Sequence, residues 1–223
     1  MGPDGAPSVL NGTVDTIAVV VLLAEFAMLR STLLRSQIRL YAAQSFVVAV
    51  LAAVLAFADN SYELLILAAL SIGLKVIAVP VVMSRTVRRA GADVAGAGSL
   101  RAASSALIAL VAAGFGFFAV GRLGLQAHGL SPTVLAVAGA IIMVAFVLMT
   151  VRTDVVSQSV GFFSLENGVS VASLVVAAGM PLILEVAFLF DLLVAVVVFG
   201  VLIRVHHAEQ GSLSTSDITA LRG

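Results

Sequence analysis

A carboxylate and a carboxamide, Glu166 and Asn167, stand side by side in the apolar segment GFFSLENGVS (residues 161–170). A charge at the centre of a membrane-spanning helix costs about 2.5–3.5 kcal/mol on insertion scales, so such residues tend to serve a function. Carboxyl groups in these surroundings can bind and release protons, and a chain of them indicates a proton or cation path. Five ionisable residues lie within apolar segments of this kind: Glu25, Lys75, Glu166, Glu185 and Asp191.

The composition is typical of an integral membrane protein. Of the 223 residues, 61% are hydrophobic and 11% are charged, and the mean hydropathy is +1.17. Soluble domains have roughly 45–50% apolar and about 25% charged residues. The net charge is zero, so nothing indicates a nucleic-acid partner. The chain has no cysteine, which excludes disulfides and cysteine-bound iron–sulfur clusters within it. We therefore expect a protein of the lipid bilayer that holds no metal or cofactor of its own.

The sequence predicts an all-α integral membrane protein with seven transmembrane helices. Apolar runs of this length are typical of membrane-spanning helices. The predicted spans cover about residues 15–34, 40–58, 63–83, 103–121, 132–151, 159–179 and 182–204. Together they make one transmembrane domain over residues 1–204, followed by a polar tail over residues 205–223. Pro80, late in the third span, predicts a local kink.

The basic residues predict the orientation of the bundle. With seven spans, ten of the 12 Lys and Arg residues fall on one side of the membrane. Arg122 falls on the other side and Lys75 lies inside a span. Six or eight spans would remove this asymmetry. Because cytoplasmic loops carry the excess of Lys and Arg, we expect a multi-pass protein of the inner (cytoplasmic) membrane. Its N-terminus would be outside and its C-terminal tail cytoplasmic.

A weak internal repeat is also visible. A shift of 122 residues places Arg30 on Arg152, Gln44 on Glu166 and Glu63 on Glu185. It lays spans one to three over spans five to seven in the same orientation, as in the parallel repeats of other membrane proteins. Two apolar three-helix segments can also align by chance, so both interpretations remain open.

Four of the buried ionisable residues are predicted to lie in one layer near the membrane midplane. At 1.5 Å per residue, they come to roughly 14–20 Å from the outer ends of their spans. These four are Glu25, Lys75, Glu166 and Asp191. Glu185 comes to only about 5 Å from the outer surface. Spans six and seven are joined by a short turn, so Glu166 and Asp191 are predicted to face one another.

Three interpretations of this layer compete. The groups could hold helices together, with Lys75 neutralised by one carboxylate. They could form a proton or cation relay. They could also form the site of a substrate transporter, although Pro80 is the one clear helix breaker inside a span. Three acids and one base in a single layer favour the relay. Four uncharged polar residues could hydrate such a path or stabilise packing: Gln44, Ser45, Ser164 and Asn167.

Residues 161–203 resemble hydrogenase-4 component E, a membrane subunit of formate hydrogenlyase and related group 4 nickel–iron hydrogenase complexes. The resembling pieces are LEN at 165–167, the PLxxE pattern at 181–185 and FDLLVAV at 190–196. IRLYAAQS at 38–45 and LKVIAVPVV at 74–82 also look like that family. The resemblance therefore covers most of the chain.

The resemblance implies a function and a set of roles. The C-terminal part of that family is similar to the K-type subunit of respiratory complex I and to the C-type subunit of multisubunit cation antiporters. In those subunits a buried glutamate on each of two neighbouring helices joins the proton pathway. Glu166 matches the first position; Asp191 is the better match to the second, and Glu185 is the alternative. The implied protein is a non-catalytic subunit of an oxidoreductase complex, whose Ni–Fe and iron–sulfur centres lie in a peripheral arm of partner subunits. The alternatives are a subunit of a cation/proton antiporter and a purely structural membrane anchor.

Overall fold

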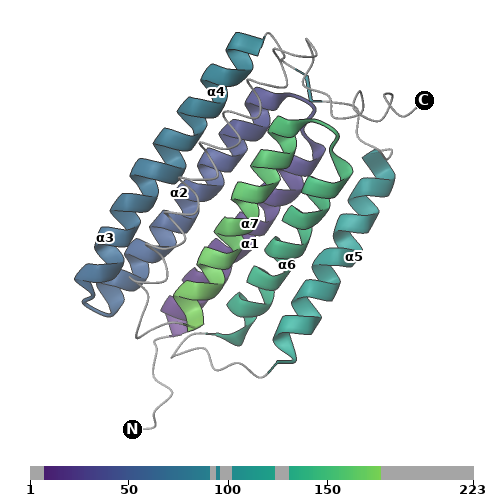
Figure 1. Cartoon of the computed structure of the whole chain (residues 1–223). Coiled ribbons are helices and arrows are strands. Elements are labelled where there is room, and N and C mark those ends of the chain that lie inside the picture. Colours follow the sequence, from purple (N-terminus) through teal and green to yellow (C-terminus); the bar gives the residue numbers. More distant parts are fainter. Residues whose placement is uncertain (1–7, 91–93, 96–101, 124–130, 177–223) are drawn as a thin grey trace, which may run out of the picture.

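The computed structural model describes residues 8–90, 94–95, 102–123 and 131–176, and these residues form a bundle of helices (Figure 1). The helices are α1 (Ser8–Arg30), α2 (Leu34–Ala58), α3 (Tyr62–Ser71), the π-helix η1 (Ile72–Ala78), α4 (Val79–Ala90), α5 (Ala102–Gly121), α6 (Pro132–Val151) and α7 (Val155–Val176). Segments α3, η1 and α4 follow one another without a break and make one long rod. The all-α prediction is confirmed for the part of the chain that the structure describes.

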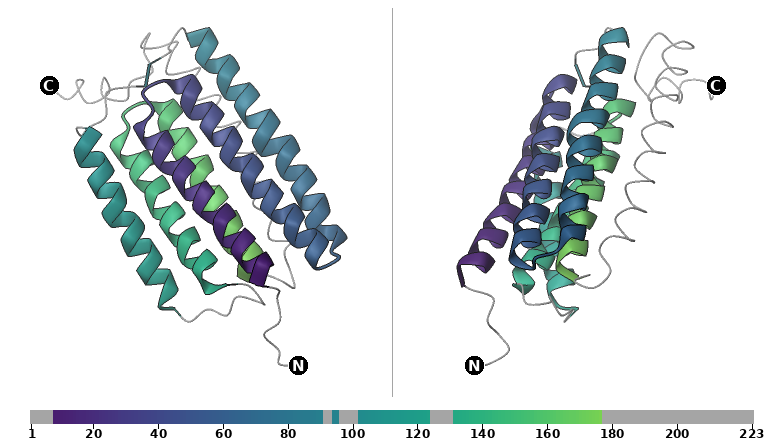
Figure 2. Two further views of the ribbon diagram at one scale, coloured as in Figure 1. Left: turned by 180° about the vertical axis from the view of Figure 1, so that it is seen from behind. Right: turned by 90° about the vertical axis from the view of Figure 1, so that its left-hand side faces the viewer.

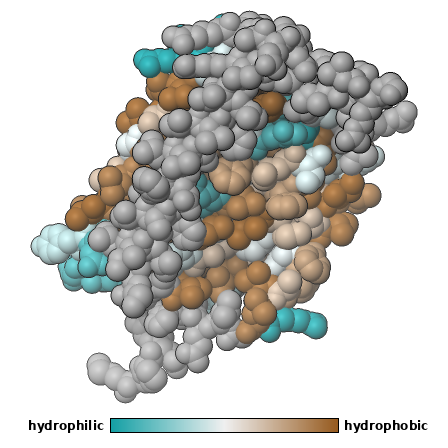
Figure 3. All heavy atoms as spheres, in the orientation of Figure 1, coloured by the Kyte–Doolittle hydropathy of each residue, from teal (hydrophilic) through white to brown (hydrophobic). Residues whose placement is uncertain are grey.

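Six helices in the described ranges are long and apolar enough to cross a membrane. They are Leu10–Arg30, Leu34–Ala58, Tyr62–Arg88, Ala103–Gly121, Pro132–Val151 and Val155–Val176. Each overlaps one of the first six predicted spans. The predicted seventh span, with Glu185 and Asp191, and the polar tail lie outside the described residues. Where Figure 3 colours the described residues, hydrophobic side chains predominate, as expected for helices that span a membrane.

The helices pack as two hairpins that lie side by side. Helix α1 packs on α2, and α6 packs on α7; α1 also packs on α6, and α2 on α7. The α3–η1–α4 rod packs against α2 at one edge, and α5 packs against α6 at the other edge (Figure 2). The four helices α1, α2, α6 and α7 therefore form the middle of the bundle.

The two hairpins have matching helix ends. Helix α1 ends at Arg30 and α6 at Val151; α2 begins at Leu34 and α7 at Val155, an offset of 121 residues in both cases. This offset differs by one residue from the shift of 122 that the sequence predicts. Arg152, in the second of these short connections, donates from Nη2 to the carbonyl oxygens of Leu29 and Ser31, both at 2.7 Å. Since those carbonyls lie in the last turn of α1 and directly after it, Arg152 joins the matching ends of the two hairpins.

The third span contains a π-helix where the sequence predicts a kink. In η1 the backbone widens, and Val79 N–H donates to the carbonyl of Leu74, five residues back. Pro80 follows directly; it has no N–H, and its ring crowds the carbonyl of the preceding turn. The distortion therefore takes the form of a wider turn before Pro80, and Lys75 lies within that turn. Single π turns inside α-helices are often found at functional sites.

The buried apolar side chains form two separate clusters. One, toward one end of the bundle, includes Met28, Tyr41, Val79 and Phe163. The other includes Val21, Val48, Leu67 and Val171, toward the opposite end of the bundle. On each of α1, α2, the third-span rod and α7, the polar residues described next fall between a residue of the first cluster and a residue of the second. The core is thus divided by a polar layer.

Candidate functional site

The polar layer consists of eight residues from α1, α2, η1 and α7. They share the property of being buried inside an apolar bundle: Glu25, Gln44, Ser45, Lys75, Ser164, Glu166, Asn167 and Ser170. Helix α7 supplies four of them, spaced three and four residues apart. This spacing places Ser164 and Asn167 close together on one side and Glu166 and Ser170 on a neighbouring side. Helix α7 therefore connects two groups of polar contacts.

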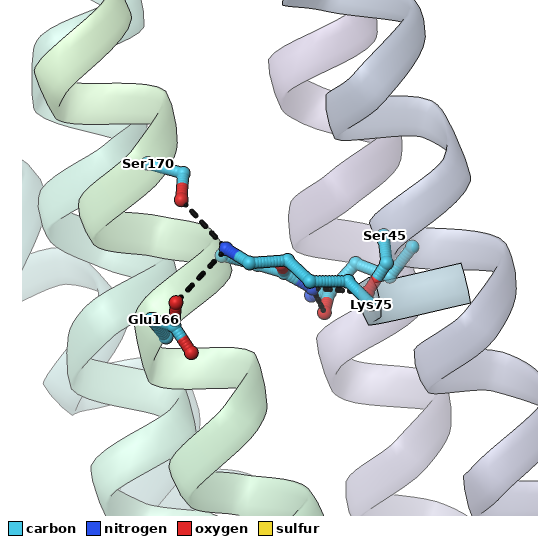
Figure 4. Close-up of polar contacts among 6 residues, drawn as sticks. Ser45, Lys75, Glu166 and Ser170 are labelled. Atoms are coloured by element: carbon cyan, nitrogen blue, oxygen red, sulfur yellow. Dashed lines mark hydrogen bonds and ion pairs between the residues drawn. The ribbon is translucent and has the colours of Figure 1, made fainter. Parts of the chain in front are cut away.

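The first group is an ion pair between the π-helix and α7 (Figure 4). The Nζ atom of Lys75 lies 3.2 Å from Oε1 of Glu166. It also donates to Oγ of Ser170 at 2.9 Å. The Lys75 side chain reaches from η1 past Ser45 of α2 to the two α7 residues (Figure 4). Lys75 is only 1% exposed, so its charge is neutralised within the protein rather than by solvent.

The second group surrounds Glu25, which is fully buried on α1. Its Oε2 atom accepts from Nε2 of Gln44 at 2.8 Å and also contacts Oγ of Ser164. The same Nε2 atom lies 3.2 Å from the carbonyl oxygen of Val21. The Oγ atom of Ser164 lies 2.7 Å from Oε1 of Gln44. Glu25, Gln44 and Ser164 therefore form a closed ring of polar contacts between α1, α2 and α7.

Asn167 extends this ring along α7 toward the ion pair. Its Nδ2 atom donates to Oε1 of Gln44 at 3.0 Å and to Oγ of Ser45 at 2.9 Å. Its neighbour in the chain is Glu166. The two groups of contacts are thus joined by the adjacent residues Glu166 and Asn167, whose side chains leave α7 in different directions. The adjacent residues Glu166 and Asn167 thus have different partners: the carboxylate pairs with Lys75, and the amide bonds to α2.

A second, smaller set of polar contacts lies one heptad away. Oγ of Ser157 donates to Oε1 of Gln37 at 2.8 Å. Nε2 of Gln37 donates to the carbonyl of Ser31 at 2.9 Å. Gln37 precedes Gln44 by seven residues, and Ser157 precedes Ser164 by seven, so the two glutamines bond the two serines in the same register. Helices α2 and α7 therefore run parallel and are joined by two similar pairs of residues. Gln44 bonds directly to a carboxyl group, that of Glu25, whereas in the other pair it is the backbone N–H of Ser157 that donates to Oδ1 of Asp154, at 2.7 Å.

The structure brings together most of the residues that the sequence singled out. Three of the four ionisable residues predicted for one layer, Glu25, Lys75 and Glu166, do occupy one layer. The predicted supporting residues Gln44 and Asn167 lie between them. Among the described residues, Lys75 pairs with one carboxylate, that of Glu166. Asp191, which is predicted to face Glu166, and Glu185, which is predicted nearer the outer surface, both lie outside the described residues.

Three residues that make buried polar contacts were not predicted from the sequence: Ser170, Gln37 and Ser157. Ser170 could have been found, because it follows Glu166 by four residues and so lies on the same face of the helix. The pairing of Gln37 with Ser157 could have been suspected from their heptad spacing to Gln44 and Ser164.

Within the described ranges, no group of three or more His, Cys, Asp and Glu residues could hold a metal ion.

These features define a multi-pass helical membrane protein with ionisable groups held in a buried polar layer. Comparison with known proteins agrees with this class. The chain is 26% identical over 211 residues to hydrogenase-4 component E of Escherichia coli K12, a match that covers 94% of this chain and 97% of that protein. The Shigella flexneri protein of the same name matches equally. The chain is also 29% identical over 190 residues to the uncharacterized protein Rv0085 of Mycobacterium tuberculosis, covering 85% of this chain and 86% of that protein.

No model of a known protein family matches the chain. No solved structure matches it. The chain is nonetheless a distant homologue of hydrogenase-4 component E over nearly its whole length, as the resemblance in the sequence predicted.

Proposed function

We propose that this chain is a membrane subunit of a redox-linked, proton-translocating complex of the hydrogenase type, and that its buried acids form part of a proton path. The observation that carries the proposal is the polar layer, in which two carboxyl groups and a lysine lie within an apolar core. Maintaining such groups is costly, and packing alone needs fewer of them. The distant relative named as a hydrogenase-4 component supports the choice of complex.

The roles of the residues follow from their contacts and from the resemblance. Glu166 is a proton-transfer group, and Lys75 modulates its charge state from 3.2 Å away. Glu25 is a further acid of the path on the other side of α7. Gln44 and Asn167 lie between the two acids. Gln44 bonds to Glu25 and accepts a hydrogen bond from Asn167, and these bonds fix the orientation of both amide side chains. Asp191 would be the second transfer group and Glu185 would gate the outer exit, or Glu185 would itself be the second transfer group.

The rest of the assembly would be supplied by other subunits. The chain has no catalytic site of its own in this proposal. Partner membrane subunits and a peripheral redox arm with Ni–Fe and iron–sulfur centres would carry out the electron chemistry. Changes of charge or conformation in that arm would alter proton binding in the polar layer. The chain would cross the inner membrane seven times, with the N-terminus outside and the tail in the cytoplasm.

The first experiment identifies the partners. We would place an affinity tag after residue 210, extract the assembly in mild detergent and identify the co-purifying proteins. Hydrogenase-type subunits with iron–sulfur proteins would support the proposal. Large antiporter-like subunits without a redox arm would instead favour the cation/proton antiporter. A chain that purifies alone as a stable homo-oligomer would contradict both.

The second experiment tests the acid. Glu166→Gln keeps the shape of the side chain but removes the ionisable group, so the redox-driven acidification of inverted membrane vesicles should fall to background while the complex still assembles. The matched control is Glu63→Gln, since Glu63 lies exposed in the first turn of α3. Unchanged acidification in Glu166→Gln would favour the structural anchor, because the network of interhelical hydrogen bonds would then serve packing alone.

A further inference from the structure

The ring formed by Glu25, Gln44 and Ser164 needs one more hydrogen than an ionised carboxylate allows. It contains three contacts: Gln44 Nε2 to Glu25 Oε2, Ser164 Oγ to Glu25 Oε2, and Ser164 Oγ to Gln44 Oε1. Each contact needs a hydrogen between its two atoms. The amide of Gln44 supplies the first, and the serine hydroxyl has a single hydrogen for the other two. If Glu25 were ionised, one of the two contacts of Ser164 would place two oxygen lone pairs against each other.

The orientation of the Gln44 amide is fixed independently of this count. Its Nε2 atom faces the carbonyl oxygen of Val21, which can only accept a hydrogen bond. Its Oε1 atom faces Nδ2 of Asn167, which can only donate. Exchanging the oxygen and nitrogen of the amide would set acceptor against acceptor at Val21. Gln44 therefore donates to Glu25 and accepts from Ser164, and the missing hydrogen must come from Glu25.

The surroundings of Glu25 agree with a neutral carboxyl group. The side chain is fully buried, and an isolated carboxylate in an apolar core is strongly disfavoured. Its second oxygen, Oε1, is buried and accepts no hydrogen bond from any described residue. The lysine of the layer, Lys75, is engaged by Glu166 and Ser170 instead. No described cation therefore forms an ion pair with Glu25.

We infer that Glu25 is a proton-binding site that is occupied in this arrangement: its Oε2–H donates to Oγ of Ser164, whose hydroxyl donates to Oε1 of Gln44. The ligand is a proton, and the site is separate from the Lys75–Glu166 pair. Loss of that proton to water would turn the Ser164 hydroxyl toward Glu25 and remove one donor from Gln44. This inference deepens the proposed function and rests on it only for the role of the proton in transport.

The test is infrared difference spectroscopy of the full chain in lipid nanodiscs at neutral pH. A protonated carboxyl group gives a C=O stretching band that shifts in heavy water, whereas a carboxylate gives none. The spectrum of the unaltered chain minus that of Glu25→Gln should contain this band. The corresponding spectrum for Glu166→Gln should contain carboxylate bands instead, because Glu166 is paired with Lys75. A Glu25→Gln difference with carboxylate bands alone would overturn the inference.

A second pair of variants decides the matter if Glu25→Gln does not fold. Ser164→Ala removes the acceptor of the Glu25 O–H group, so the protonated-carboxyl band should shift in position. Ser157→Ala is the matched control, since Ser157 occupies the equivalent place one heptad away and bonds to Gln37. No shift in Ser164→Ala, or an equal shift in both variants, would contradict the assignment. Because these spectra need no partner subunit, their result is independent of the test of the hydrogenase-type complex.

Discussion

Lys75 and Glu166 form an ion pair inside the bundle, with Nζ 3.2 Å from Oε1 and the two side chains only 2% and 10% exposed. The pair joins η1 to α7, although helices α4, α5 and α6 come between them in the chain. If one of the two residues is replaced, the other keeps a buried charge that little water can reach. The two residues should therefore respond very differently to single and to joint replacement.

Lys75→Met should lower the free energy of unfolding by about 3–5 kcal/mol, because it leaves the Glu166 carboxylate buried without its cation. Replacing both residues, as Lys75→Met with Glu166→Leu, should recover most of that loss, since apolar side chains of similar size suit the surrounding core. Reversible unfolding in mixed detergent micelles, followed by circular dichroism, measures both values. A double variant less stable than Lys75→Met would show that the pair is not the main interaction of these residues.

Helices α5 and α6 approach closely through two glycines, and this contact gives a sharp packing test. A Cβ atom added at Gly116 would collide with the carbonyl of Gly139, and one added at Gly139 would lie 2.7 Å from the carbonyl of Gly116. Gly116→Ala should therefore destabilise the bundle by about 1–3 kcal/mol, the usual cost of overpacking. Gly114→Ala is the control, since nothing lies within 4 Å of its added Cβ. A thermal midpoint that falls equally in both variants would contradict the close α5–α6 contact.

Much of the fold could be predicted because membrane spans have a simple signature. Long apolar runs give six helices in the described ranges, and Pro132 begins α6 as expected for proline in a first helical turn. The depth estimate also placed Glu25, Lys75 and Glu166 in one layer, since depth depends only on the count of residues from each helix end.

The contacts within that layer could not be predicted in the same way. Periodicity gives the depth of a residue, but the neighbour of each face depends on how the helices are arranged around one another. Glu25 on α1 meets Ser164 on α7, 139 residues later, because the two hairpins lie side by side. The π-helix around Lys75 also has no clear sequence signal besides Pro80, five residues after it.

The two glutamine–serine contacts between α2 and α7 allow the effect of a variant on helix packing to be distinguished from its effect on proton transfer. Gln37→Leu and Gln44→Leu should each lower the free energy of unfolding by about 0.6 kcal/mol, the average measured for interhelical hydrogen bonds in membranes, and by no more than about 1.7 kcal/mol, the largest such value. Under the proposed function, only Gln44→Leu should also reduce redox-driven acidification of vesicles, because only Gln44 bonds to a carboxyl group. An equal loss of acidification in both variants would mean that helix packing, rather than the hydrogen bond to Glu25, limits transport.

The predicted count of seven spans can be tested by labelling, because the chain has no cysteine of its own. With seven spans and the N-terminus outside, Asp59→Cys in the α2–α3 connection should react with a membrane-impermeant maleimide in intact cells. Ser216→Cys, in the tail, should react only after the membrane is opened. A span count of six would place the tail on the same side as Asp59, so both cysteines would react from outside. Thr32→Cys, in the α1–α2 connection, is the control for a cytoplasmic loop, since one helix separates it from Asp59. If Thr32→Cys reacted from outside and Asp59→Cys did not, the orientation derived from the basic residues would be reversed.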